Sequence, residues 1–193
     1  MCAKNASTLL VVRTRDITLT NSAVVEAETI STADANTTHK TMTTIGIDVG
    51  KNGAIAWITD GKACVEKMPE TLQDLWELMM SITLNAEGGG AQVFAYIEQV
   101  ASSPQMGVVS AFSFGRGYGN LEMALTAAGI PFERVRPQVW MKSLGCMTKG
   151  DKNVTKRKAQ ELFPDQKVTH ATADALLIAH YGTMLIAYYG AKA

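Results

Sequence analysis

The stretch Thr44–Trp57 constrains the fold more than any other part of the chain. It reads TIGIDVGKNGAIAW, in which alternating β-type residues lead to a carboxylate, Asp48, and then to a tight turn. Asn52-Gly53 is a strong hairpin signal, because both residues tolerate positive φ. The stretch therefore predicts two antiparallel strands, with Asp48 held rigidly at the end of the first. Such an acid could be aimed at a metal ion or a phosphate, or it could simply face water.

The bulk composition indicates one globular domain with no overall preference for a charged partner. The 193 residues suit one domain with a short extension. The chain is 47% hydrophobic and has a formal net charge of 0. No uninterrupted apolar run approaches the ~20 residues of a membrane span. The three cysteines, Cys2, Cys64 and Cys146, form no Cys-x-x-Cys pair, which predicts reduced thiols in an intracellular protein and no zinc site.

Residues 1–43 differ from the rest of the chain. They are rich in Thr, Ser and Ala and contain no Gly, Pro or aromatic residue. They lack the apolar core of a secretory signal and carry acids that transit peptides normally avoid. We therefore expect a dispensable, partly disordered extension over 1–43 and a folded domain over 44–193, with Met42 as the functional start. Loss of folding or activity on deletion of residues 1–41 would contradict this expectation.

The pattern after the hairpin alternates between strands and helices. A helix is expected after an N-cap at Thr71, with Trp76 in the core, and it should end before Gly88. The other expected elements are strands over 63–68, 93–97 and 130–135 and helices over 108–128, 138–144, 154–162 and from about residue 169.

Further acids lie at the ends of later elements. Glu98 ends the apolar run 93–97, and a carboxylate at the end of a buried strand is costly unless it has a partner. An ion pair is one such partner. His170 and Asp174 are four residues apart in the last helix, so they share one face or a face and its cap. Each alone could be an ordinary cap or first-turn residue. Together with Asp48, the three acids on three elements predict a single site.

Three glycines, Gly115, Gly117 and Gly119, interrupt the helical pattern. Each costs about 1 kcal/mol relative to Ala in a helix interior. Either the helix begins after them, or a backbone or nucleic acid strand approaches closely there. Arg116 and Tyr118 between them suit phosphate contact and base stacking, although a loop rich in turn residues is equally compatible with the pattern.

The segment from Arg134 to Lys167 is strongly basic. It holds nine Lys and Arg residues against three acids, a local charge of +6 in a neutral chain. A solvated surface is the ordinary explanation of a charge run. A bias this large in a balanced chain favours an anion-binding surface.

The order of strands and helices is that of the ribonuclease H-like arrangement, an α/β fold with a mixed sheet and helices on both faces. In that arrangement, acids from the first and fourth strands and the last helix converge. The residues themselves resemble RuvC-type Holliday junction resolvases over about 44–183, and most strongly the phage and chloroplast-like branch. The matching pieces are IGIDVGKNGAIAWI, YIEQV, FGRGYGNLEMALTAAGIPFERVRPQVWMKSLG, KGDKNVTKRKAQELFP and HATADALLIAHYG. One departure from the bacterial pattern is Ala171, three residues before Asp174, where an Asp or His is common; His170 lies four before.

The resemblance implies an endonuclease that resolves four-way DNA junctions by paired symmetric nicks and leaves 5′-phosphate and 3′-hydroxyl ends. It also implies two Mg²⁺ ions per active site about 3.5–4 Å apart, with Mn²⁺ as the alternative metal. Asp48 would bridge the two ions, and Glu98 and Asp174 would each bind one. His170 would be a ligand or would orient the attacking water. These four residues are the expected catalytic and metal-binding set.

The implied partners are branched DNA and a second copy of the chain, with no membrane. The protein would be intracellular, in the cytoplasm or nucleoid, and it could be encoded by a phage or act in an organelle. The expected DNA-binding residues are Arg116, Tyr118, Lys149, Lys152, Lys156, Arg157 and Lys158. Tyr118 or Phe114 could stack on an opened base.

Three other functions fit parts of the pattern. One is a ribonuclease H-like nuclease that acts on other branched DNA. Another is an actin-like ATPase domain, which also carries Asp-x-Gly on a hairpin, although this chain is short for the two such domains those proteins need. The last is a DNA-binding module without catalysis.

Overall fold

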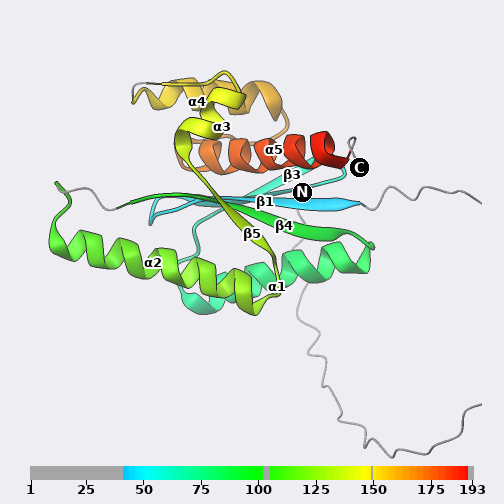
Figure 1. The fold of residues 1–193 in the computed structure, drawn as a ribbon, viewed down its shortest axis with the longest axis horizontal. Coiled ribbons are helices and arrows are strands. Elements are labelled where there is room, and N and C mark those ends of the chain that lie inside the picture. Colours follow the sequence, from blue (N-terminus) through cyan, green and yellow to red (C-terminus); the bar gives the residue numbers. More distant parts are fainter. Residues whose placement is uncertain (1–40, 102–104, 149, 191–193) are drawn as a thin grey trace, which may run out of the picture. The chain divides into compact units, whose positions relative to one another are not determined.

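A five-stranded mixed sheet forms the centre of the computed structural model, which describes residues 41–101, 105–148 and 150–190 (Figure 1). The strands are β1 (Met42–Asp48), β2 (Ala54–Thr59), β3 (Lys62–Lys67), β4 (Gln92–Glu98) and β5 (Phe132–Val135). Their order in the sheet is β3-β2-β1-β4-β5. β1, β2 and β3 pair antiparallel, whereas β4 pairs parallel with both β1 and β5. The first strand of the chain is therefore the middle strand of the sheet.

Helices cover both faces of this sheet (Figure 1). The helices are α1 (Leu72–Gly88), α2 (Val108–Ala127), α3 (Pro137–Ser143), α4 (Lys152–Leu162) and α5 (His170–Gly190). α1 and α2 lie on one face, and α3, α4 and α5 on the other. Ile45 and Ile47 of β1 belong to the core under α1 and α2, whereas Ala54 and Ala56 of β2 pack under α5. Because successive side chains of a strand point to opposite faces, the strands contribute residues to two hydrophobic cores, one on each face of the sheet.

α5 lies very close to the sheet because two glycines make room for it. A Cβ added at Gly46 of β1 would clash with the backbone of Ala175 and Ala179 in α5. A Cβ added at Gly182 of α5 would clash with the ring of Tyr96 on β4. These contacts fix the height of α5 over β1 and hence the position of the residues at its N-terminal end.

Most of the predicted elements are present, with some differences in detail. The Thr71 hydroxyl accepts a hydrogen bond from the Asp74 amide at 3.1 Å and so caps α1 as expected. The helix continues through Gly88 instead of ending before it. Trp76 is 36% exposed, so its placement in the core was wrong. The buried face of α1 is instead formed by Leu75, Leu78, Met79, Ile82, Thr83 and Ala86.

Some expectations concern the ends of the chain and its thiols. Of the extension predicted over 1–43, residues 1–40 lie outside the described residues, whereas Met42 and Thr43 belong to β1. Cys2 also lies outside them. Cys146 is a free, buried thiol, but Cys64 is disulfide-bonded, so the expectation of reduced thiols is wrong for Cys64. In the part of the chain that the structure describes, no helix is both long and apolar enough to cross a membrane.

Candidate active site

Asp48 and Glu98 end two neighbouring strands at the same edge of the sheet. β1 and β4 run parallel, with Ile47 opposite Ile97, and adjacent strands are about 4.8 Å apart. Both isoleucines point into the core under α1 and α2. Because successive side chains alternate between faces, the following acids lie on the other face, the one that α5 covers. Folding thus makes neighbours of two carboxylates that are far apart in the sequence.

Asp174 joins them from the first turns of α5. Its neighbours Ala173 and Ala175 are fully buried, so this part of the helix sits against the protein interior. The negative charge on Asp174 raises the pKa of both Asp48 and Glu98. The three carboxylates that the sequence predicts to converge are therefore brought together at one end of the sheet.

Burial and mutual repulsion leave these carboxylates hard to ionise. Burial, followed by the charges of Glu98 and Asp174, raises the pKa of Asp48 from 3.8 to about 7, against a smaller opposing effect of Lys152. Burial is also the main cause that raises the pKa of Glu98 from 4.5 to about 7. The pKa of Asp174 is raised by burial as well, although Thr155, Lys152 and His170 oppose the shift. The site holds more negative charge than its neighbours neutralise.

Trp140 on α3 fixes the orientation of Glu98. Its indole Nε1 donates a hydrogen bond to Glu98 Oε1 at 3.1 Å, and the side chain is fully buried. This bond lowers the pKa of Glu98 and so opposes the effect of burial. The sequence indicates only that Trp140 packs inward. The available signal is general, because a buried indole N–H usually finds an acceptor.

Two basic residues border the acids. His170 is the first residue of α5; it is exposed, and its charge lowers the pKa of Asp174. Lys152 begins α4 and lowers the pKa of both Asp48 and Asp174. His170 therefore lies at the solvent side of the site, beside Asp174, and the charge of Lys152 acts on the acids from a different helix.

The donor set fits a hard divalent cation in its chemistry. All three acids offer carboxylate oxygens, the ligands that Mg²⁺ prefers. Asp174 Oδ1 is buried and has no hydrogen-bond partner among the described residues. Within residues 41–101, 105–148 and 150–190, however, no three His, Cys, Asp or Glu side chains are placed so that they could hold one ion. The negative charge and the oxygen donors suit a metal ion, but the side chains are not arranged as the ligands of one ion. Two Mg²⁺ ions therefore stay a prediction.

The glycine-rich part of α2 is helical throughout. A Cβ added at Gly115, Gly117 or Gly119 would meet nothing within 4 Å, so no backbone in the described part of the chain approaches there. Arg116 is exposed. Tyr118 is half-buried against the core under α1 and α2, and it hydrogen-bonds with Glu122 and Arg134, which pair with each other at 2.6 Å. Of the two DNA contacts expected on α2, Arg116 and Tyr118, only Arg116 is exposed.

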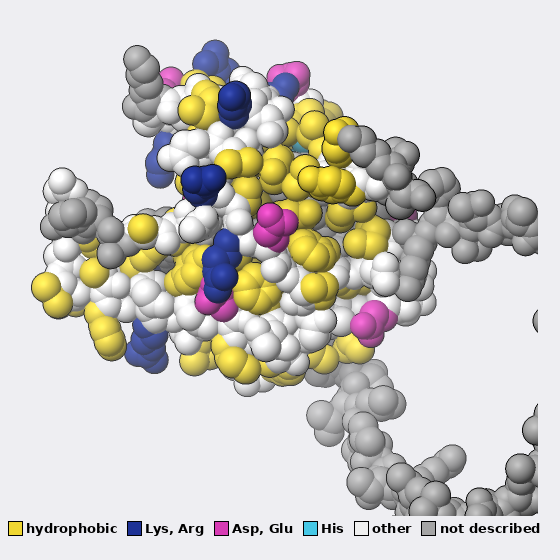
Figure 2. All heavy atoms as spheres, in the orientation of Figure 1, with side chains coloured by type: hydrophobic (Ala, Val, Ile, Leu, Met, Phe, Trp, Pro, Cys, Tyr) yellow, Lys and Arg dark blue, Asp and Glu magenta, His cyan; other side chains and the backbone are white. Residues whose placement is uncertain are grey.

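The basic segment gathers on α4. Figure 2 shows Lys and Arg side chains clustered over the part of the molecule formed by α3 and α4. Lys152 and Arg157 are exposed and Lys156 is half-buried. Lys158 pairs with Glu161 at 3.2 Å. Lys149 lies outside the described residues. A positive surface thus borders the carboxylates on the side of α4.

Comparisons with known proteins identify the fold. No protein-family model matches the chain, and no curated protein matches it in sequence. The structure of Thermus thermophilus RuvC matches with a TM-score of 0.50 and 20% identity, over 77% of this chain and 97% of that one. T. thermophilus RuvC in complex with a Holliday junction substrate matches with a TM-score of 0.50 and 18% identity, over 77% and 96%. The predicted fold class, ribonuclease H-like, is confirmed.

Proposed function

We propose that the chain is a metal-dependent endonuclease of the RuvC type, from the phage and chloroplast-like branch, that resolves four-way DNA junctions by paired symmetric nicks. The observation that carries this proposal is the convergence of Asp48, Glu98 and Asp174 from three distant parts of the chain. The similar solved structures support it, because both are RuvC and one is in complex with a Holliday junction substrate.

Each acid has a role that its position supports. Asp48, Glu98 and Asp174 would supply the carboxylate oxygens that hold two Mg²⁺ ions, with Asp48 shared between the ions as the resemblance implies. The ions, when bound, would supply a nucleophilic water and stabilise the leaving oxygen. Trp140 would keep one oxygen of Glu98 occupied and so aim the other into the site.

The two basic residues beside the acids would act on the substrate. His170, at the solvent side of Asp174, would orient the attacking water or serve as a further ligand. Lys152 would hold the phosphate that is cut, because its charge already acts on both Asp48 and Asp174. The basic side chains of α4 would contact neighbouring phosphates, a mode that gives strong dependence on salt.

A homodimer completes the proposal, because a four-way junction offers two equivalent strands to cut. α2 carries large apolar side chains that solvent reaches freely in the described part of the chain: Val108, Val109 and Phe112 are 85%, 80% and 73% exposed, and Met123 is 60% exposed. Exposed apolar surface of this kind is typical of interaction sites. We assign it to contact with a second copy.

The test is a synthetic four-way junction with labelled strands, incubated with Mg²⁺. Wild type should make symmetric nicks with 5′-phosphate ends, and Asp48→Asn and Glu98→Gln should make none. Matched controls are Asp60→Asn in the β2–β3 turn and Glu66→Gln on β3, both at exposed positions, which should cut normally.

Other outcomes separate the alternative functions. Equal cutting of plain duplex would indicate a general nuclease, and preference for flaps or three-way junctions would indicate a nuclease for other branched DNA. ATP hydrolysis without cleavage would favour the actin-like ATPase. Junction binding without cleavage in any divalent metal would leave a binding module.

A further inference from the structure

A surface on the α5 side of the sheet combines aromatic rings with one carboxylate. Tyr96 of β4 lies opposite Glu133 of β5 in the parallel ladder, and adjacent strands are about 4.8 Å apart. Tyr96 and Val135 belong to the core under α5. Because alternate residues of a strand share a face, Glu133, two residues before Val135, also points to the α5 side. The carboxylate therefore lies beside Tyr96, on the edge strand of the sheet.

Aromatic side chains continue from Tyr96 in two directions. The ring of Phe94 on β4 packs against Tyr96 with the centroids 5.2 Å apart, and the ring of Tyr181 on α5 packs edge-on against it at 6.1 Å. Tyr189 follows in the last turn of α5 and is 65% exposed. Figure 2 shows hydrophobic side chains gathered between α5 and β5, with an acidic side chain among them. The rings thus extend from a nearly buried floor to an exposed end.

The tyrosines and the carboxylate lie close enough to act on one another electrostatically. Burial is the main cause that raises the pKa of Tyr96 to about 12, and the negative charge of Glu133 adds to this shift. Burial also raises the pKa of Tyr181, with further contributions from Glu133 and Tyr189. We call these four residues, Tyr96, Glu133, Tyr181 and Tyr189, the tyrosine cluster.

The tyrosine cluster has no positive charge of its own in the described part of the chain. Glu133 is exposed and forms no ion pair there, whereas Arg134 and Lys158 pair with other acids. Residues 170–190, which form α5, include no Lys or Arg. The C-terminal end of a helix carries a partial negative charge that favours a cation, and Tyr189 lies at this end. The cluster therefore offers negative charge and aromatic rings to a cation from outside.

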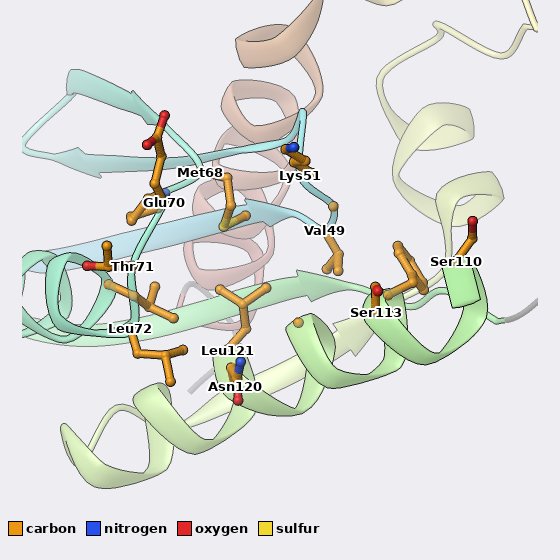
Figure 3. A pocket seen from close by; sticks show the side chains of 15 residues that line it. Val49, Lys51, Met68, Glu70, Thr71, Leu72, Ser110, Ser113, Asn120 and Leu121 are labelled. Atoms are coloured by element: carbon orange, nitrogen blue, oxygen red, sulfur yellow. The ribbon is translucent and has the colours of Figure 1, made fainter. Parts of the chain in front are cut away.

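The chemistry and the shape of this surface suit a basic side chain of another protein. Ammonium and guanidinium groups are attracted to the faces of aromatic rings. Met184, Tyr188 and Tyr189 form an open apolar rim, with exposed fractions of 45%, 55% and 65%, and Tyr and Met are enriched in protein interfaces. By contrast, the cavity of about 500 Å³ against α1 and α2 lies on the other face of the sheet (Figure 3). An open rim around a carboxylate fits a protruding side chain.

We propose that the tyrosine cluster binds a Lys or Arg side chain of a partner protein, with the cation against the tyrosine rings and paired with Glu133. The proposal does not depend on the proposed function, because the exposed end of the cluster is remote from the acids. Tyr189 follows Asp174 by 15 residues in α5, which is about 22 Å along a helix. A partner could therefore bind there while substrate occupies the acids.

The test uses a library of random short peptides, displayed and selected on the full-length protein. Each selected peptide is synthesised with a fluorescent label, together with a twin in which norleucine replaces the Lys or Arg, and affinities are measured by fluorescence anisotropy. Wild type should bind the basic peptide about 10-fold more tightly than its twin. Glu133→Gln removes the charge, and Tyr189→Leu removes the ring but keeps apolar bulk. Each variant should reduce this ratio to about 3-fold or less.

Two matched controls carry the same changes at exposed positions elsewhere. Glu66→Gln on β3 and Trp76→Leu on α1 should keep the wild-type ratio. The proposal is overturned if no peptide is selected, if the selected peptides need no Lys or Arg, or if Glu133→Gln and Tyr189→Leu both keep the wild-type ratio. The last result would mean that basic peptides bind elsewhere, for example at the acids of the candidate active site. Because the measurement needs neither DNA nor metal, failure of the proposed function would leave it unaffected.

Discussion

Replacement of Asp48 by Asn should stabilise the metal-free protein while it abolishes cleavage. The unfolded chain releases the Asp48 proton near pH 3.8, whereas the folded protein holds it to about pH 7. Between these values the folded state binds more protons, so this carboxyl lowers stability progressively as the pH rises. From pH 5 to about pH 7, where the folded Asp48 ionises, the free energy of unfolding falls by 1.36 kcal/mol per pH unit, which amounts to at most about 3 kcal/mol between pH 5 and pH 8. Asn at this position carries no charge and escapes the penalty.

The assay is urea unfolding in EDTA at pH 5 and pH 8, followed by tryptophan fluorescence. The stability of Asp48→Asn relative to wild type should increase by up to about 3 kcal/mol from pH 5 to pH 8. Asp60→Asn, in an exposed turn, should show no such change. Addition of Mg²⁺ should raise the stability of wild type by about 2.7 kcal/mol at 100 times the dissociation constant, and should raise that of Asp48→Asn less. A variant that is no more stable than wild type at pH 8 would refute the assignment of Asp48 to a crowded, buried acidic site.

Four further predictions follow from named contacts. Trp140→Phe removes the hydrogen bond to Glu98, which is worth about 1.5–3 kcal/mol for a charged acceptor. The cleavage rate should fall at least 10-fold, while the affinity for the junction in EDTA should stay unchanged. An unchanged cleavage rate would exclude a role of Trp140 in positioning Glu98. Gly46→Ala should lower the free energy of unfolding in urea by about 1–3 kcal/mol, because the methyl overlaps the α5 backbone; wild-type stability would show that α5 can shift. Arg157→Gln should reduce the slope of log affinity against log salt by about 0.9, and an unchanged slope would mean no phosphate contact. His170→Ala should slow cleavage, and a wild-type rate would remove His170 from the site.

The sheet and the acids at its edge could be predicted because their signals are local. Asp48 follows an alternating strand and precedes an Asn-Gly turn, and Glu98 ends an apolar run, so each acid is marked by its own neighbours in the sequence. The order of strands and helices then limits how these ends can meet. The expectation that Asp48, Glu98 and Asp174 meet at one end of the sheet came from the ribonuclease H-like order of the elements, not from the local signals alone.

The features that were missed depend on contacts between distant elements. The bond from Trp140 to Glu98 joins α3 to β4, and nothing in the local sequence distinguishes an indole that donates to a carboxylate from one that only packs. Trp76 fits the helical spacing of the core residues, yet it lies at the edge of the buried face of α1. The glycines of α2 predicted a break or a close contact, and the structure has neither among its described residues, because the helix tolerates their cost.

The most direct measurement is the anomalous difference map of a crystal soaked in Mn²⁺. The account predicts two peaks about 3.5–4 Å apart, both in contact with Asp48, one also with Glu98 and the other with Asp174. A map with no peak at these carboxylates, or with side chains that turn away from one another, would contradict it.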